Sequence, residues 1–245
     1  MAVVVSTFYK FVAISDCEAL RASLTELCRA SAIRGTIVIA NEGVNATISG
    51  KAPAIAALLA VLRSDQRFAD LSSREIETRD HPFGRLKIKV KPEIVTFGAP
   101  EADPFLRVGR YVKPEDWDAL IGGPDVILID ARNHYEIAVG SFAGARDPGT
   151  RSFSEFPAFV ERELAGHKHK RIAMFCTGGI RCEKASSYLL SQGFAEVYQL
   201  QGGILNYLTR SPPDAGRWRG ACFVFDGRVA LGFRGAKGSH ALCDD

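Results

Sequence analysis

The sequence has no hydrophobic run that approaches the roughly 18 apolar residues of a membrane span. Its start, MAVVVSTFYK, has no basic region before the short apolar run, and Lys10 interrupts that run, so we expect no signal peptide. None of the six cysteines form a CxxC pair, and their spacing is wide and irregular. These absences argue against a membrane protein or a secreted disulfide scaffold, and they predict a soluble protein of the reducing cytoplasm.

An excess of one charge is also missing. The chain carries 31 basic and 28 acidic residues, a net charge of +3 in 245 residues, so any contact with nucleic acid must come from a local cluster. Hydrophobic residues make up 47% of the chain and charged residues 24%, which is ordinary for a protein with a large core. The length predicts one or two domains, and no internal repeat or low-complexity tract is visible.

Residues 1–97 predict a small mixed domain. The strand-like VVVSTFYKFV precedes a helical pattern with Asp16 as its N-cap, and two short β-runs flank NEGVN. A second helix, APAIAALLAVLRS, has Pro53 near its start and leads into further strand in SREIETRDHPFGRLKIKVKPEIVTFG. The order βα-ββ-αβ predicts a ferredoxin-like α+β sandwich.

The remainder of the chain predicts an α/β domain. Residues 98–121 are rich in proline and are expected to be a connector. From 122 to 215, the strands DVILID, RIAMF and EVYQL alternate with the helical segments SEFPAFVERELA, CEKASSYLLSQG and GGILNYL. This alternation predicts a doubly wound parallel sheet, with ligands at the carboxyl ends of its strands. Residues 216–245 are expected to be a C-terminal tail with one strand-like piece, ACFVFDGRVAL.

The string RIAMF-CTGGIR-CEKASSYLL places a cysteine where a ligand is expected. Cys176 follows a strand and begins a turn with Gly178 and Gly179, and Arg181 enters the next helix. Two glycines let successive N–H groups point inward around an anion, and the helix N-terminus adds positive potential. A nearby arginine would further lower the pKa of the thiol, so we predict a nucleophilic thiolate. The alternative is a buried structural cysteine, which is common in α/β cores.

A second pattern indicates RNA. Four cations alternate with Leu86, Ile88 and Val90, so a strand would carry all four on one face. These candidates for RNA contact are Arg85, Lys87, Lys89 and Lys91, and Arg79 and His81 could extend the patch. The alternative is a solvated edge strand whose lysines prevent aggregation.

Three weaker candidates have structural alternatives. Cys182 could resolve an oxidised Cys176, although a half-buried helix residue is the favoured interpretation. Asp130 and Arg132 follow a strand and could bind substrate or form an ion pair that braces a loop. Cys222, His240 and Cys243 lack a CxxC pair, and no two-His-one-carboxylate pattern stands out, so we predict no metal site. No flavin motif is evident, and no organic cofactor is predicted.

The CTGGIR loop resembles the active-site loop of rhodanese domains. VILIDAR-NHYEIAVGSFAGA and YQLQGGILNYL are similar to other segments of that family, so the resemblance covers residues 122–215. It implies a loop of Cys176, Thr177, Gly178, Gly179, Ile180 and Arg181 in which the cysteine carries a persulfide. The loop is one residue shorter than in the related phosphatases. Thr177 stands where many thiosulfate-cleaving members have a charged residue, which argues against simple thiosulfate sulfurtransfer.

A wider resemblance covers nearly the whole chain. NEGVNATISG, the full CTGGIRCEKASSYLL string and WRGACFVFDGRVAL together are similar to the bacterial tRNA uridine hydroxylases. This resemblance implies oxygen-dependent 5-hydroxylation of the wobble uridine in the tRNA anticodon loop, with molecular oxygen as co-substrate. Two alternatives stay open: a persulfide sulfurtransferase, and a non-catalytic RNA-binding or redox module. No protein partner is predicted.

Overall fold

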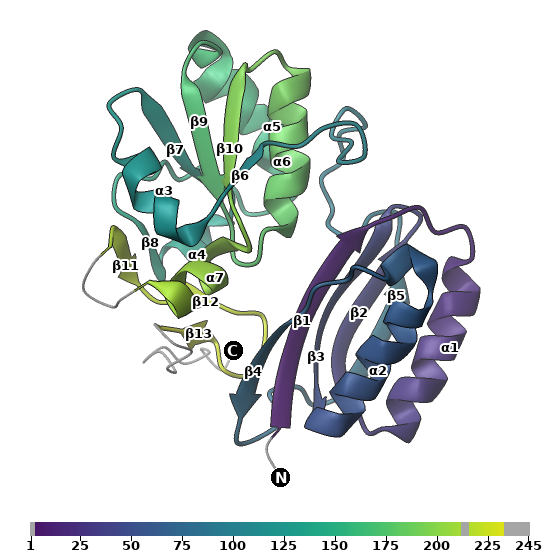
Figure 1. Ribbon diagram of the computed structural model, residues 1–245. Coiled ribbons are helices and arrows are strands. Elements are labelled where there is room, and N and C mark those ends of the chain that lie inside the picture. Colours follow the sequence, from purple (N-terminus) through teal and green to yellow (C-terminus); the bar gives the residue numbers. More distant parts are fainter. Residues whose placement is uncertain (1–2, 212–215, 233–245) are drawn as a thin grey trace. The chain divides into compact units, whose positions relative to one another are not determined.

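The computed structural model describes residues 3–211 and 216–232. The chain divides into two compact units, residues 1–96 and residues 97–245, each with its own sheet and helices (Figure 1). The expected fold class, an α+β sandwich followed by a parallel-sheet domain, is confirmed. No helix within the described ranges is long and apolar enough to cross a bilayer.

The first unit is a five-stranded sheet with both long helices on one face (Figure 1). Its strands lie in the order β4-β1-β3-β2-β5, and only the β2–β5 pair is parallel. The segment expected as further strand forms two strands, β4 and β5, which take opposite edges of the sheet. The elements are β1 (Val3–Phe11), α1 (Cys17–Ala30), β2 (Arg34–Ala40), β3 (Gly43–Lys51), α2 (Ala52–Ser64), η1 (Gln66–Phe68), β4 (Arg74–Thr78) and β5 (Leu86–Val90).

The core of the first unit lies between the sheet and its helices. Alternate residues of β3, Val44, Ala46 and Ile48, are buried against Leu24 of α1 and Leu58 of α2. This period-two burial places the hydrophobic side chains on the helix-covered face of the sheet. At the edge, the three apolar residues of β5 also pack against this core. The apolar residues of the alternating segment 85–91 therefore face the core, as the period-two pattern predicts.

The second unit is a four-stranded parallel sheet in the order β6-β10-β9-β7. Helices α3 and α7 cover one face, and α5 and α6 cover the other, as a doubly wound sheet requires (Figure 1). Its main elements are β6 (Arg110–Val112), α3 (Pro114–Ile121), β7 (Val126–Asp130), α4 (His134–Ile137), β8 (Gly140–Phe142), α5 (Phe156–Phe159), β9 (Arg171–Phe175), α6 (Ile180–Ser191), β10 (Glu196–Leu200), α7 (Gly203–Arg210), β11 (Trp218–Gly220), β12 (Cys222–Phe223) and β13 (Ala230–Leu231).

Two segments of this unit differ from the expectation. Residues 110–121, within the expected connector, form β6 and α3, and β6 pairs in parallel with β10 as an edge strand of the sheet. The continuous helix expected over SEFPAFVERELA is divided into α5 and a five-residue π-helical segment, Val160–Leu164, between 3-10 turns. The tail piece ACFVFDGRVAL forms the short antiparallel pair β12–β13.

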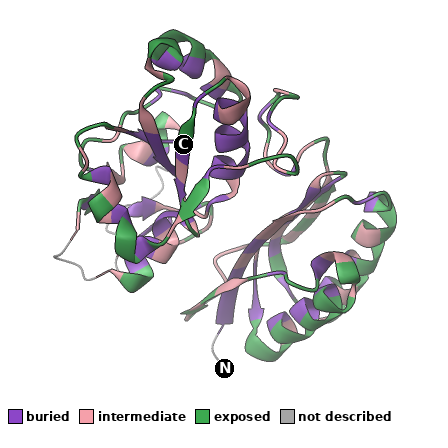
Figure 2. Cartoon of the chain, turned by 45° about the horizontal axis from the view of Figure 1, so that its top comes forward, coloured by how far each residue is buried: buried purple, intermediate pink, exposed green. Residues whose placement is uncertain are grey.

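Helix α6 is buried on all sides over Arg181–Leu189 (Figure 2). The chain before β6 contributes to this cover, because the Gly109 N–H donates to Ser186 Oγ at 2.8 Å and the Ser187 hydroxyl donates to the Asp103 carbonyl at 2.8 Å. Close packing on all sides leaves a helix little room to shift. The surrounding contacts therefore position its N-terminus, and with it the loop that precedes it.

Candidate active site around Cys176

The expected cysteine loop joins the end of β9 to the start of α6. Cys176 follows Phe175, the last residue of the strand, at the carboxyl edge of the parallel sheet, where ligands of doubly wound folds bind. Gly179 is the N-cap of α6 and has a φ of 106°, a conformation that L side chains rarely adopt. The Gly179 N–H donates to Cys176 Sγ at 3.2 Å. The turn thus directs a backbone donor at the sulfur.

The N-terminus of α7 braces the same loop from the next connection. The N–H of Ile204 donates to the Cys176 carbonyl at 2.9 Å, and the N–H of Leu205 donates to the Thr177 carbonyl at 3.1 Å. Gly203 makes this approach possible, because a Cβ there would lie 2.5 Å from the Cys176 carbonyl oxygen. The loop is therefore held by two helix starts rather than one.

Electrostatics favour the thiolate form of Cys176. Burial alone acts to raise the pKa of this side chain, which is 1% exposed. A hydrogen bond from the Cys182 thiol, the charge of Arg181, and the backbone N–H groups of Cys182 and Gly179 outweigh burial and lower the pKa from 9.0 to about 6. Cys176 is therefore mostly ionised at neutral pH, the state in which a cysteine is a nucleophile.

Cys182 lies beside Cys176 in the first turn of α6. Its side chain is fully buried, not half-buried as expected. Burial and the hydrogen bond to Cys176 hold the pKa of Cys182 well above its usual range, so this thiol stays protonated. The two sulfurs thus have separate states, a thiolate acceptor and a neutral donor.

Arg181, expected as a cation beside Cys176, is buried and ion-paired. Its guanidinium makes a two-pronged ion pair with Glu136, at 2.6 and 2.7 Å, and only 7% of the residue is exposed. A third contact runs from Arg181 to the Thr177 hydroxyl at 3.4 Å. The negative charge of Glu136 partly offsets the positive charge of Arg181. Arg181 therefore lowers the pKa of Cys176 as a member of an ion pair, not as an isolated cation.

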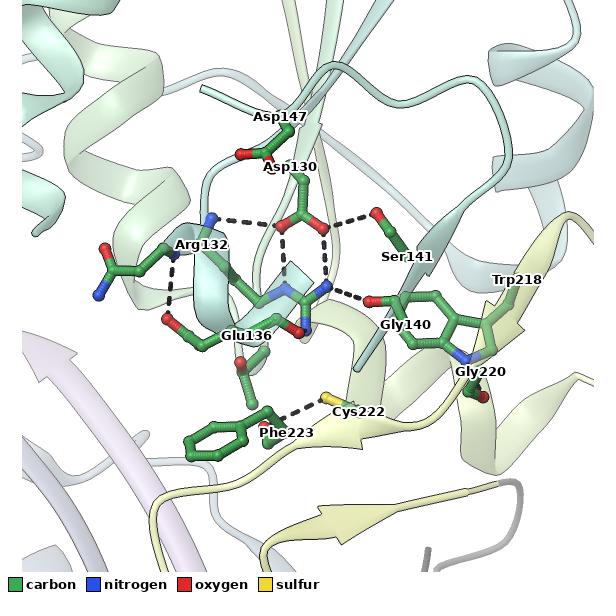
Figure 3. Close-up of polar contacts among 12 residues, drawn as sticks. Asp130, Arg132, Glu136, Gly140, Ser141, Asp147, Trp218, Gly220, Cys222 and Phe223 are labelled. Carbon is green, nitrogen blue, oxygen red and sulfur yellow. Dashed lines mark hydrogen bonds and ion pairs between the residues drawn. The ribbon is translucent and has the colours of Figure 1, made fainter. Parts of the chain in front are cut away.

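A second ion pair lies behind the first. Asp130, at the end of β7, accepts two hydrogen bonds from the Arg132 side chain, at 2.9 and 2.7 Å, and both side chains are completely buried (Figure 3). Arg132 also donates to the Gly140 carbonyl at 2.6 Å, and Ser141 donates to Asp130 at 2.7 Å. All of these hydrogen-bond partners belong to the protein, so the pair braces the loop after β7. The geometry therefore favours the ion pair that braces a loop over a substrate-binding role for Asp130 and Arg132.

The C-terminal strands reach the cysteine loop. Cys222, in β12, is fully buried and interacts with the Thr177 hydroxyl, and its thiol donates to the Phe223 carbonyl at 3.6 Å (Figure 3). Burial raises the pKa of Cys222 to about 12, so the thiol is neutral. No group of three or more His, Cys, Asp or Glu that could hold a metal occurs among the described residues. His240 and Cys243, the other metal candidates, lie outside them.

The candidate RNA contacts lie in the first unit. Arg85, Lys87, Lys89 and Lys91 are all exposed along β5, whose apolar residues face the core. Lys87 and Lys89 also line a groove of about 800 Å³ between β5 and α1, together with Arg21 and Arg29. Arg79 is exposed, whereas His81 is partly buried and hydrogen-bonded to Ser49 at 3.0 Å.

Two residues of the site escaped sequence reasoning. Glu136 is the N3 residue of a capping box whose N-cap is Asn133, and this spacing is a recognisable signal for a helix start. That signal does not reveal the partner, because Arg181 lies 45 residues away. Gly203 is the other residue, and its need for space depends on the tertiary approach of α7 to the loop.

Each of the two units matches a known family. Residues 3–94 match the family described as UPF0176 acylphosphatase like domain, and residues 113–210 match the Rhodanese-like domain. Among solved structures, a rhodanese-related protein from Thermoplasma volcanium is 20% identical, with a TM-score of 0.35, and covers 45% of this chain and 97% of its own.

Curated relatives match over almost the full length. A tRNA uridine(34) hydroxylase from Synechococcus elongatus is 51% identical over 243 residues, which is 99% of this chain and 90% of the relative. A protein of the same name from Albidiferax ferrireducens is 50% identical over 97% of this chain and 76% of its own length. The chain belongs to the tRNA uridine(34) hydroxylase family.

Proposed function

We propose that this protein hydroxylates C5 of the uridine at position 34, the wobble position of the tRNA anticodon loop, with molecular oxygen as co-substrate. The relatives' name supplies the reaction and the nucleotide. The observation that carries the proposal is the buried Cys176 thiolate at the carboxyl edge of the parallel sheet. We place the reaction in the cytoplasm, where a reducing environment keeps this thiol free.

The thiolate can activate uracil by addition. C6 of uracil is electrophilic, because the C5–C6 double bond is conjugated to the C4 carbonyl. A bond from Cys176 Sγ to C6 converts C5 into an electron-rich enolate carbon, which then forms a bond to oxygen. The backbone N–H groups at the start of α6 are suited to stabilise the negative charge that develops. Loss of the C5 proton and of the thiolate restores the double bond and the free cysteine.

The electron balance defines what else the reaction needs. Replacing C5–H by C5–OH removes two electrons from the uridine. Reduction of O₂ to the hydroxyl oxygen and water consumes four, so a separate reductant supplies the other two. Because Cys176 is 1% exposed, a base reaches Sγ only when part of its cover moves. The uridine must also leave the anticodon stack, which costs less in a loop than in a duplex.

A nucleoside analysis tests the proposed function. Mass spectrometry of tRNA nucleosides should find 5-hydroxyuridine in cells with the protein and little or none in cells without it. Restoring the wild-type chain should restore the nucleoside. A chain with Cys176→Ser should fold but fail, because a hydroxyl of similar size does not ionise at neutral pH. Cys28→Ala, which changes a buried cysteine of the first unit, is the control and should restore the modification.

The same experiment separates the alternative reactions. Normal 5-hydroxyuridine with Cys176→Ser would remove the cysteine from the mechanism. A thiolated nucleoside that disappears with Cys176→Ser, with no change in 5-hydroxyuridine, would instead identify a persulfide sulfurtransferase. Unchanged nucleosides in cells lacking the protein would favour a non-catalytic role.

A further inference from the structure

Three aromatic rings form a connected row beside the cysteine loop. The ring of Tyr135, in α4, meets that of Phe223, in β12, with centroids 5.5 Å apart and planes at 86°. Phe223 meets Phe225 in turn, at 5.2 Å and 82°. We call these three residues the aromatic row. It joins two segments about 90 positions apart in the sequence, so it exists only in the folded unit.

Both ends of the row are open to solvent. Phe225 is 62% exposed and Tyr135 is 47% exposed, whereas Phe223 between them is partly buried. Among the described residues only six large hydrophobic side chains are this exposed, and two of them belong to the row. Exposed aromatic area contributes little to folding, because it is not removed from water. The core therefore does not account for these two rings.

The row ends at the reactive cysteine's own neighbours. The guanidinium carbon of Arg181 lies 6.0 Å from the centroid of the Phe225 ring, within the range of a cation–π contact. Phe223 follows Cys222, which interacts with Thr177 of the cysteine loop. Phe225 therefore contacts Arg181, the residue whose charge acts on Cys176.

We propose that the aromatic row is a stacking platform for unpaired bases of the RNA strand that carries the target uridine, with Phe225 at the end that contacts Arg181. This inference rests on the proposed function for the identity of the strand. It adds Phe225 and Tyr135 as positioning residues that hold the strand without taking part in the chemistry.

The chemistry of a loop strand fits this surface. Unpaired bases present flat π-faces, and they stack on aromatic side chains irrespective of sequence. Because the two exposed rings lie at opposite ends of the row, each can stack on a different base of the RNA. A platform of this kind would offset the cost of unstacking the target uridine, because neighbouring bases regain on the protein the contacts that they lose in the anticodon loop.

Binding by an anticodon stem–loop RNA tests the platform. Phe225→Leu keeps an apolar side chain and removes the ring, and we expect its dissociation constant to rise roughly fivefold or more, the effect of losing one stacked base. Phe225→Trp should bind at least as tightly as the wild type. Phe105→Leu is the matched control, since Phe105 is 54% exposed in the same unit but outside the row, and it should bind within twofold of the wild type.

Abasic substitutions identify the stacked base. Removing one loop base at a time should reveal a position whose loss weakens wild-type binding but has no further effect on Phe225→Leu. Tyr135→Leu should show the same coupling at this or a neighbouring position. Equal binding by the Phe225 and Phe105 variants, or losses that multiply at every abasic position, would overturn the platform.

The outcomes are independent of the reaction itself. If the wild-type protein binds the stem–loop and Phe225→Leu shows the coupling, the platform holds even if no 5-hydroxyuridine forms. If the wild-type protein forms 5-hydroxyuridine but the coupling is absent at every position, the platform is wrong and the proposed function stands. An unchanged pKa of Cys176 in each variant shows that the cysteine loop is intact.

Discussion

At the scale of single residues, the notable feature is a thiolate held in nearly complete burial. Burying a charge is costly unless hydrogen bonds and opposite charge compensate it. For Cys176 the compensation comes from the loop itself and the first turn of α6: a loop N–H, a neighbouring thiol and an arginine. The Cys182 thiol is the simplest of these to alter, because Ala and Ser differ there mainly in the presence of a donor.

Cys182 should therefore set part of the acidity of Cys176. Cys182→Ala removes the hydrogen-bond donor, so the pKa of Cys176 should rise above about 6, whereas Cys182→Ser should keep it near the wild-type value. The ultraviolet absorbance of the thiolate, followed against pH with Cys176→Ser as the blank, measures this. The same midpoint in all three proteins would show that Cys182 has no such influence.

The depressed pKa of Cys176 also links acidity to stability. The folded pKa, about 6, lies below the ordinary value of 9.0, so the folded state favours the thiolate. This contribution is complete above the unfolded pKa and is lost as pH falls through about 6. As the pH rises from about 6 to 9.0, we expect the free energy of unfolding of the wild type to increase relative to that of Cys176→Ser. Urea denaturation at several pH values measures it, and parallel curves would contradict it.

At the scale of elements, α4 is only four residues long, yet it carries the partner of Arg181. Glu136 accepts from the Asn133 N–H at 3.1 Å and also pairs with Arg181, so one carboxylate joins the helix start to the cysteine loop. Both ion-pair partners are buried. Removing one partner of such a pair leaves an uncompensated charge, which costs far more than the pair contributes.

Glu136→Gln should therefore destabilise the protein by about 3–5 kcal/mol. Adding Arg181→Met to this variant should recover part of the loss, since no unpaired buried charge then remains. Chemical denaturation of both single variants and the double variant gives the coupling energy. Additive losses would show that the two side chains act independently, against the geometry of the two-pronged contact.

Strand β5 is the proposed electrostatic contact for RNA, because its exposed lysines lie on one face of the strand. Replacing Lys87, Lys89 and Lys91 with Ala should weaken tRNA binding and lower the slope of log affinity against log salt by roughly 2 to 3, at about 0.7–0.9 per lost phosphate contact. The matched control removes Lys113, Arg162 and Lys168, three exposed cations of the second unit. If both triple variants show the same slope as the wild type, the β5 lysines serve only to protect the sheet edge.

At the scale of the whole molecule, periodic patterns predicted most of the architecture. Alternation of strands and helices indicated both units, and the CTGGIR string placed the cysteine at the correct edge of the sheet. Local patterns could not reveal the Glu136–Arg181 pair or the aromatic row, whose members meet only through tertiary packing. Strand β6, which the sequence places in a connector, was missed for a different reason. Three residues with prolines nearby carry too little periodicity to identify an edge strand.

Covalent trapping separates RNA binding through the β5 lysines from the reaction at Cys176. With 5-fluorouridine at the wobble position, a fluorine stands where a proton must leave C5, so addition of Cys176 at C6 should produce a stable protein–RNA adduct. Cys176→Ser should form none. The triple lysine variant should form the adduct slowly at low RNA concentration and at the normal rate at saturation, because its defect is in binding alone. Denaturing gels and intact-mass measurements detect the adduct. If binding is intact and only free RNA is recovered, C6 addition loses its support, and Cys176 must instead act on the oxidant, as a persulfide or sulfenic acid.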